Sequence, residues 1–341
     1  MRAVSVYQAE GMVLCHDVTE IVPGKHKGRA FKKGHVIRKE DINKLLTIGK
    51  ENIYVWEVNE NTLHENDAAV RFAKAAAGPG LCLAEPSEGK VEVKAGLTGL
   101  LKVDIEALEK INDIDQVAAA TLHSNQIVHA GTKIAGCKIV PLVIETEKIC
   151  RIEKICADHY PVLEVKTLRP HKVGVVTTGG EIYHGRIKDC FGPVLANKFQ
   201  QWGSSILRQI FVPDDDFLIA ESIKQLLLEG ADMIVTTGGM SVDPDDVTPA
   251  GIRTAGGRIV SYGAPTLPGA MFLLAYLGTI PVLGLPGCVM YHKNTIFDLV
   301  VPRLLAGEEL TRRDITRLGH GGLCLGCNEC RYPNCGFGKG C

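Results

Sequence analysis

The sequence predicts an α/β protein whose largest part is a three-layer, doubly wound parallel sheet, preceded by smaller β-rich domains and followed by a cysteine-rich tail. Three observations support this prediction. Strand-like and helix-like segments alternate after Pro170, 45% of the 341 residues are hydrophobic, and five cysteines crowd between Cys324 and Cys341. Alternating strands and helices form right-handed crossovers, which place helices on both faces of a parallel sheet.

Composition narrows the classes of partner. The 38 Lys and Arg residues against 39 Asp and Glu give a net charge of -1, so no overall field attracts nucleic acid or an anionic membrane. The apolar stretch 271–291 is long enough to cross a bilayer. Prolines and glycines interrupt it, so we expect a buried helix followed by a buried parallel strand. The N-terminus has no signal-peptide pattern, which predicts a cytoplasmic protein.

We expect four segments along the chain. Residues 1–78 form an α+β domain with a helix over 37–49, a strand over 52–58 and a helix over 64–78. Residues 79–168 form a β-rich middle domain, in which we identify no function. Residues 169–310 form the large α/β domain, and residues 311–341 form the cysteine-rich tail.

The large domain predicts a regular alternation of elements. A strand over 171–178 runs into a Gly-Gly loop. It is followed by a helix over 192–203, a strand over 205–214, a helix over 216–230, a strand over 231–237, a helix over 246–257, a strand over 258–265, a helix over 269–278, a strand over 280–287 and a helix over 289–307.

Two of these strands end in the same letters, VVTTGG at 175–180 and IVTTGG at 234–239. Paired glycines directly after a parallel strand let the backbone turn with positive φ and present N–H groups without a Cβ in the way. Such sheets bind ligands outside the carboxyl ends of their strands. We therefore expect a polar binding site at these loops. The simpler alternative is that both are tight turns needed only for packing.

Carboxylates follow both loops. Glu181 stands in the first loop, and Asp243, Asp245 and Asp246 come between the second loop and the next helix. A helix start favours acidic residues, so we expect at least one of them to cap that helix. A carboxylate at this edge can also accept hydrogen bonds from the amino groups of a ligand.

Three ordered motifs resemble the molybdopterin-binding domain of molybdenum-cofactor biosynthesis proteins, such as molybdopterin molybdenumtransferases and their gephyrin-type relatives. They are TTGGEI at 177–182 with Asp189 after it, VTTGGMSVDPDDV at 235–247, and PGAMFLLAYLGTIPVLGLPG at 268–287. The resemblance covers residues 169–310. It implies an α/β domain that binds molybdopterin.

The resemblance also implies which residues hold the pterin and the phosphate of molybdopterin. Ser241 and the loop amides suit phosphate oxygens, and Asp246 suits a pterin amino group or a contact on the adenylate side. The full set carried over is Thr178, Gly179, Glu181, Thr237, Gly238, Gly239, Ser241, Asp246, Pro268, Gly269, Pro286 and Gly287.

Several positions depart from the family's pattern. Gly180 stands where the family has an acidic residue, and Ala270 stands where it has Lys. Asp243 replaces a Gly, and Cys288-Val289 replace Asn-Pro. In the family the replaced acid and Lys lie near the place where molybdate is handled, and an oxyanion needs a cationic or N–H-rich seat. The resemblance therefore implies ligand binding and leaves metal insertion open.

The tail carries cysteines in the spacing C-x2-C-x2-C-x4-C-x5-C. Thiolates two residues apart can bind one centre, and four of them complete a zinc site or an iron–sulfur cluster. The predicted ligands are Cys324, Cys327, Cys330, Cys335 and Cys341. Zinc and iron–sulfur remain alternatives, and the non-metal alternatives are a flexible thiol-rich tail or a disulfide knot.

Two functions fit these observations. The first is an insertase, a molybdopterin molybdenumtransferase that accepts adenylylated molybdopterin together with molybdate or tungstate, with Mg²⁺ as a further candidate cofactor. The second is a non-enzymatic cofactor carrier or a metal- or redox-responsive regulator, which the missing Lys and acid favour. A third interpretation is a relative that has lost the ligand. The resemblance also implies a homodimer.

Overall fold

The computed structural model describes residues 2–22, 26–55, 61–241, 243 and 246–340. These residues form two compact units. The N-terminal unit spans residues 1–96, 103–122 and 130–164, and the C-terminal unit spans residues 97–102, 123–129 and 165–341. The finer division into four segments stays a prediction. In the described part of the chain, no helix combines the length and apolar character needed to cross a bilayer.

The N-terminal unit is rich in short strands. The expected helices over 37–49 and 64–78 are present but shorter, and of the expected strand over 52–58 only the part before residue 56 lies within the described residues. The elements in this half of the chain are β1 (Arg2–Ser5), β2 (Val18–Val22), β3 (His26–Phe31), α1 (Asp41–Thr47), β4 (Asn52–Val55), β5 (Thr62–His64), α2 (Glu65–Ala76), β6 (Leu81–Leu83), β7 (Lys90–Ala95), β8 (Gly99–Val103), α3 (Ile105–Asn112), β9 (Val117–Thr121), β10 (Ile127–Val128), β11 (Lys133–Ile139), β12 (Val143–Glu145), α4 (Thr146–Asp158) and β13 (Leu163–Lys166).

The C-terminal unit contains a six-stranded sheet in the order β15-β14-β16-β19-β18-β17. The first four strands in this order are parallel, whereas β18 and β17 are antiparallel to their neighbours. The elements are β14 (Lys172–Thr178), α5 (Gly180–Tyr183), α6 (Phe191–Gln201), β15 (Ser205–Val212), α7 (Asp216–Leu228), β16 (Met233–Thr237), α8 (Thr248–Thr254), β17 (Arg258–Tyr262), β18 (Leu273–Leu277), β19 (Ile280–Leu285), α9 (Ile296–Leu305) and α10 (Arg312–Thr316).

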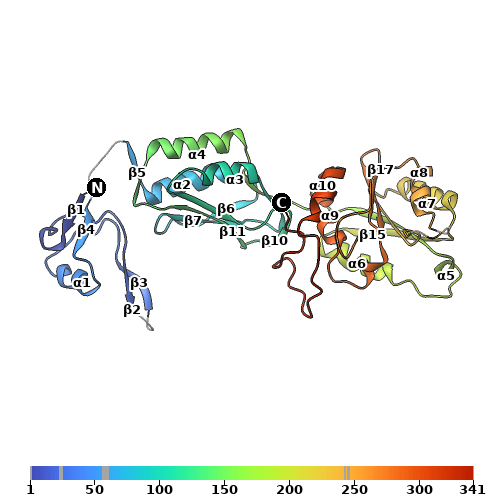
Figure 1. The fold of residues 1–341 in the computed structure, drawn as a ribbon, viewed down its shortest axis with the longest axis horizontal. Coiled ribbons are helices and arrows are strands. Elements are labelled where there is room, and N and C mark those ends of the chain that lie inside the picture. Colours follow the sequence, from blue (N-terminus) through green and yellow to red (C-terminus); the bar gives the residue numbers. More distant parts are fainter. Residues whose placement is uncertain (1, 23–25, 56–60, 242, 244–245, 341) are drawn as a thin grey trace. The chain divides into compact units, whose positions relative to one another are not determined.

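Helices cover both faces of this sheet, which gives the expected three layers (Figure 1). On one face, alternate strand residues such as Val175 and Val235 pack with α6 and α9. On the other face, Val176 and Ile234 pack with α7 and α8. Successive side chains of a strand point to opposite faces, so fully buried strands read as continuous apolar runs. The predicted α/β class is confirmed, with a mixed sheet.

One predicted element is wrong. Residues 269–278, expected as a helix, contain the strand β18, which runs antiparallel to β19 with Leu277 paired to Ile280. Gly278, at φ +61°, makes the tight turn between them. A buried strand and a buried helix are both apolar all round, so the hydrophobic pattern does not separate them. The turn glycine is the local feature that decides for the hairpin.

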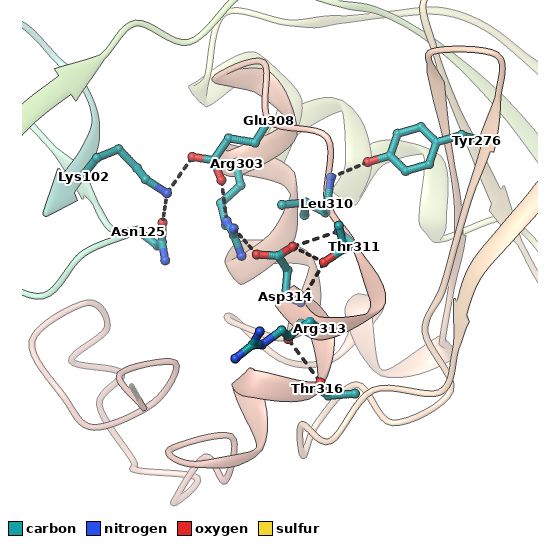
Figure 2. Close-up of polar contacts among 10 residues, drawn as sticks. All are labelled: Lys102, Asn125, Tyr276, Arg303, Glu308, Leu310, Thr311, Arg313, Asp314 and Thr316. Carbon is teal, nitrogen blue, oxygen red and sulfur yellow. Dashed lines mark hydrogen bonds and ion pairs between the residues drawn. The ribbon is translucent and has the colours of Figure 1, made fainter. Parts of the chain in front are cut away.

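A network of ion pairs joins the end of α9 to α10 (Figure 2). Arg303 donates from Nε to Glu308 Oε2 at 2.8 Å and from Nη2 to Asp314 Oδ1 at 2.8 Å. Lys102 Nζ lies 2.7 Å from Glu308 Oε1 and also donates to Asn125 Oδ1 at 2.6 Å. Residues 97–102 and 123–129 are thereby linked to the helices that precede the tail.

Candidate functional site

All four predicted ligand loops leave the same edge of the six-stranded sheet. Thr177 at the end of β14 pairs with Thr237 at the end of β16, and Thr237 pairs with Leu285 at the end of β19. The loop between β17 and β18 lies at this edge too, because Tyr262 pairs with Leu273, which in turn pairs next to the end of β19 at Gly284. The carboxyl edge of the parallel strands therefore collects these loops, as expected for a ligand site in an open α/β sheet.

The two Thr-Thr-Gly-Gly loops are in direct contact. Thr237 Oγ1 donates to Thr177 Oγ1 at 3.0 Å. Gly238 has φ +85°, and a Cβ built on it would lie 2.3 Å from the carbonyl oxygen of Thr178. Gly239, at φ +58°, approaches the Thr248 hydroxyl in the same way. Both positions therefore require glycine, for the backbone conformation and for the close approach of the loops.

The threonine side chains at the ends of β14 and β16 are buried and form hydrogen bonds within the protein. Thr177, Thr178 and Thr237 are at most 2% exposed. Gln209 Nε2 donates to Thr177 Oγ1 at 2.8 Å and to Asp189 Oδ2 at 2.8 Å. Because the Thr177 and Thr237 hydroxyls are hydrogen-bonded within the protein, they hold the two loops in register.

Two of the predicted polar side chains are exposed at the loops. Glu181 lies in the short helix α5, and Ser241 follows the second Gly-Gly pair. Tyr262 Oη donates to the carbonyl oxygens of Met240 and Ser241 at 3.1 and 3.2 Å. This bond ties the second loop to the end of β17, so Ser241 is held close to the following loop.

Asp246 is partly buried and organises the turn after the second loop. Its Oδ2 accepts a hydrogen bond from the Asp243 amide at 2.8 Å, while its own amide donates to the Asp243 carbonyl at 2.9 Å. Burial, reinforced by the negative charge of Asp246, raises the pKa of the Tyr262 hydroxyl. The carboxylate and the phenol are therefore close enough to interact electrostatically.

Sequence reasoning missed Asp214, which lies beside the first loop. Its Oδ2 accepts a hydrogen bond from the Gly180 amide at 3.0 Å and lies 4.0 Å from the point where a side chain on Gly180 would begin. Asp214 follows β15, so the rule that led to the other loops, polar residues directly after a parallel strand, could have found it. The same is true of neither Gln209 nor Thr248, which lie within a strand and a helix.

The third and fourth loops are packed against neighbouring elements. A Cβ on Gly269, at φ +130°, would lie 2.6 Å from Ile296 Cγ2 at the start of α9. Pro268 is partly buried, Pro286 is buried, and Gly287 is exposed. The cysteine at 288 lies in the short 3₁₀ helix Gly287–Met290, and burial raises the pKa of its thiol.

Four tail cysteines line one cavity of about 530 Å³. They are Cys324, Cys327, Cys330 and Cys335, and residues 291–294 line the same cavity. Asn294 Nδ2 lies 2.9 Å from Cys330 Sγ. Cys341 lies outside the described residues. Among those that are described, no three His, Cys, Asp or Glu side chains are arranged to hold a metal ion, and the described tail cysteines are free thiols.

Comparison with known families gives two matches. Residues 174–306 match the family described as a probable molybdopterin binding domain. The chain contains a molybdopterin-binding domain. This domain includes both Thr-Thr-Gly-Gly loops and the strands that carry them. Residues 3–57 match a family described only as a domain of unknown function.

The curated relatives match only about a quarter of this chain. A molybdopterin adenylyltransferase from Pyrococcus furiosus is 29% identical over 92 residues, which are 27% of this chain and 54% of the relative. A CinA-like protein from a Mycobacterium species (strain MCS) is 33% identical over 87 residues, which are 26% of this chain and 21% of the relative. The chain thus covers less than two thirds of the length of either relative.

Solved structures were also compared. The molybdopterin biosynthesis enzyme MoaB from Thermus thermophilus is 19% identical with a TM-score of 0.33, over 40% of this chain and 98% of that one. A molybdopterin biosynthesis MoeA protein from Pyrococcus horikoshii is 15% identical with a TM-score of 0.32, over 92% of this chain and 75% of that one.

Proposed function

We propose that this protein binds molybdopterin, or adenylylated molybdopterin, at the carboxyl edge of the six-stranded sheet, and acts in making or handling the molybdenum cofactor. The observation that carries the proposal is the contact between the two Thr-Thr-Gly-Gly loops, bridged by the 3.0 Å hydrogen bond from Thr237 to Thr177. Both loops lie inside the family match at residues 174–306. The positive φ of Gly238 and Gly239 turns the backbone after β16, which allows loop N–H groups to face a ligand phosphate.

The side chains proposed to read the ligand are the exposed and partly buried ones. Ser241 supplies a hydroxyl to the phosphate, and Glu181 and Asp246 supply carboxylates to the amino groups of the pterin. The glycines and prolines of the four loops supply backbone contacts. The exposure of Glu181 and Ser241 and the hydrogen-bonding groups that these side chains carry support the assignments.

We favour a carrier or regulator over an insertase. An insertase must neutralise molybdate or tungstate during transfer, and Ala270 leaves the third loop without a cation at that position. The two functions differ in one assay, cofactor formation from adenylylated molybdopterin and molybdate in the presence of Mg²⁺. A carrier binds the pterin and gives no molybdate-dependent product, whereas an insertase gives product with turnover.

We further propose that the tail binds zinc or an iron–sulfur cluster. Support comes from the cysteine spacing and from the cavity that four of these cysteines share. Because the described side chains are not arranged as a metal site, binding requires the tail thiols to converge on the ion. Metal analysis and the visible absorption of anaerobically purified protein distinguish zinc from an iron–sulfur cluster. A homodimer in the cytoplasm completes the proposal, and sedimentation tests the oligomeric state.

Anaerobic titration with molybdopterin, followed by pterin fluorescence, tests the binding proposal. Asp246→Asn keeps an oxygen that can accept from the Asp243 amide but removes the charge, and we expect about tenfold weaker binding, the usual size of one lost charge-assisted hydrogen bond. Glu221→Gln, on the exposed face of α7, is the matched control and should bind like the parent. A parent protein that does not bind molybdopterin would refute the proposal.

A further inference from the structure

The cysteine tail is attached to the third ligand loop by two backbone hydrogen bonds. The Leu267 amide donates to the Gly322 carbonyl at 2.8 Å, and the Cys324 amide donates to the Leu267 carbonyl at 2.8 Å. Leu267 and Leu323 thereby form an isolated parallel β-bridge. Leu267 directly precedes Pro268 and Gly269, and Cys324 is the first thiol of the tail cavity. A hydrogen bond therefore links Cys324 of the tail directly to Leu267, the residue that precedes Pro268 in the third loop.

The rest of the tail grips the start of α9. Tyr332 Oη donates to the Asp298 carbonyl at 3.4 Å, and Asn294 Nδ2 lies 2.9 Å from Cys330 Sγ. Phe337 is 4% exposed. Since Gly269 packs against Ile296 of the same helix start, the tail and the third loop share one support. Movement of the tail thiols would therefore be transmitted to the loop through the bridge at Leu267 and through the start of α9.

The third loop combines hydrogen bonds of its own with contacts from outside it. Within the loop, the Gly263 amide donates to the Phe272 carbonyl at 2.8 Å and the Ala264 amide donates to the Ala270 carbonyl at 2.9 Å. The Thr266 side chain is 1% exposed, and its hydroxyl has no hydrogen-bond partner among the described residues. An unsatisfied buried hydroxyl costs free energy, and contacts from outside the loop help to offset that cost. The bridge to residues 322–324 is such a contact.

We propose that a thiophilic metal ion bound by the tail thiols fixes the Leu267–Gly269 loop and thereby raises the affinity of the domain for molybdopterin. Each thiol that joins the ion loses its proton to solvent, and the ion takes up the thiolate sulfur without any change of oxidation state. When Cys324 and Cys330 bind the same ion, residues 322–324, which are hydrogen-bonded to Leu267, have less freedom to move. The link to molybdopterin rests on the proposed binding of molybdopterin, whereas the link between metal and loop rests only on the proposed binding of metal by the tail.

Hydrogen exchange of the full chain, reduced and anaerobic, tests the link between metal and loop with Zn²⁺ as the probe. We expect Zn²⁺ to slow exchange of the Leu267 and Cys324 amides by about tenfold. These amides exchange only when the segment opens locally, and a bound ion stabilises the closed state. The double variant Cys327→Ser/Cys330→Ser should lose this response. The matched control Cys82→Ser/Cys150→Ser removes two exposed cysteines of the N-terminal unit and should keep it.

The outcomes separate this inference from the proposed function. Failure of Zn²⁺ to bind, or Zn²⁺ binding without slower exchange at Leu267 and Cys324, overturns the link between metal and loop. Slower exchange combined with unchanged molybdopterin affinity overturns the regulation alone. Slower exchange in a protein that never binds molybdopterin refutes the proposed function and leaves the metal-responsive loop standing. Slower exchange together with tighter molybdopterin binding, both lost in the tail variant, is the result we expect.

Discussion

Thr237 donates a hydrogen bond from its hydroxyl to the hydroxyl of Thr177 at 3.0 Å, and so joins the ends of two parallel strands at the point where both turn into Gly-Gly loops. Gln209, in the neighbouring strand β15, donates to the same Thr177 oxygen at 2.8 Å. Three neighbouring strands are therefore locked together directly beneath the proposed ligand site. The loops have a rigid base although their tips are exposed.

Thr237→Val should test this base. Valine has the same shape as threonine and fits the buried site, so the substitution removes the hydrogen bond with little change in packing. We expect a loss of about 1–2 kcal/mol in the free energy of unfolding, the usual cost of a broken buried hydrogen bond. Urea unfolding measures it. The control Thr254→Val removes an exposed hydroxyl of α8 that donates to Asp216 and should cost less than about 0.5 kcal/mol. Equal costs for the two variants would contradict the account.

Gly238→Ala should be far more costly than Gly230→Ala. Both glycines have positive φ, at +85° and +96°, so both substitutions strain the backbone. Only Gly238 also faces the Thr178 carbonyl, 2.3 Å from a built Cβ, whereas nothing lies within 4 Å of one on Gly230. We expect the Gly238 variant to be less stable by an extra amount of about 1–3 kcal/mol, the range for overpacking. Thermal unfolding of both variants checks this, and similar melting temperatures would mean that the loops do not touch.

Lys198→Met should destabilise the C-terminal unit strongly. Lys198 Nζ lies 2.6 Å from Asp298 Oδ1, and the two side chains are 13% and 7% exposed. Removing the lysine leaves a buried carboxylate without its counter-ion, which costs about 3–5 kcal/mol. Lys224→Met breaks an exposed pair with Glu221 instead and should cost less than about 1 kcal/mol. Denaturant unfolding at neutral pH compares the two.

The cost of Lys198→Met should also depend on pH. Burial raises the pKa of Asp298 even with Lys198 beside it, and the variant raises it further. A carboxyl with a raised folded-state pKa makes the fold less stable as pH rises from its unfolded value through its folded value. The penalty of the substitution should therefore be small at acid pH, grow as Asp298 ionises and level off above the pKa of the variant. A penalty that does not change with pH would contradict this explanation.

Arg303→Met should weaken the network of Figure 2. It should also make the free energy of unfolding depend less on pH at acid pH. Burial acts to raise the pKa of Asp314, but hydrogen bonds from Thr311 and Arg303 prevail and lower it to about 2. A carboxyl with a lowered folded-state pKa stabilises the fold above its unfolded pKa, and this contribution is lost as pH falls toward the folded value. The parent should lose stability between about pH 4 and pH 2. The variant should be less stable at neutral pH and lose less over that interval, as followed by acid-dependent urea unfolding.

Much of the sheet could be predicted because its signals are local. The repeated Thr-Thr-Gly-Gly letters placed the two loops, and the helix expected over 216–230 is present as α7 (Asp216–Leu228), capped by Asp215. Amphipathic helices such as α7 separate the strands and make the parallel order predictable. The antiparallel β17–β18 edge was not predicted, since an apolar run without polar positions has no period.

The chemistry of the loops was less predictable than their position. Sequence reasoning gave the threonines a ligand role, whereas Thr178 and Thr237 point into the protein and are buried. Which face a hydroxyl takes at a strand end depends on the neighbouring strand, here on Gln209 and Thr177, and that pairing is not local in sequence. The attachment of Cys324 to Leu267 is likewise a contact between distant segments.

The most direct test of the central claim is hydrogen exchange of the full chain with and without molybdopterin. The account predicts slower exchange in the two loops at 178–182 and 238–243, at the carboxyl edge of the sheet, and no change at the opposite edge around Lys172 and Asp232. Protection confined to the opposite edge, or no protection of either loop at saturating molybdopterin, would contradict it.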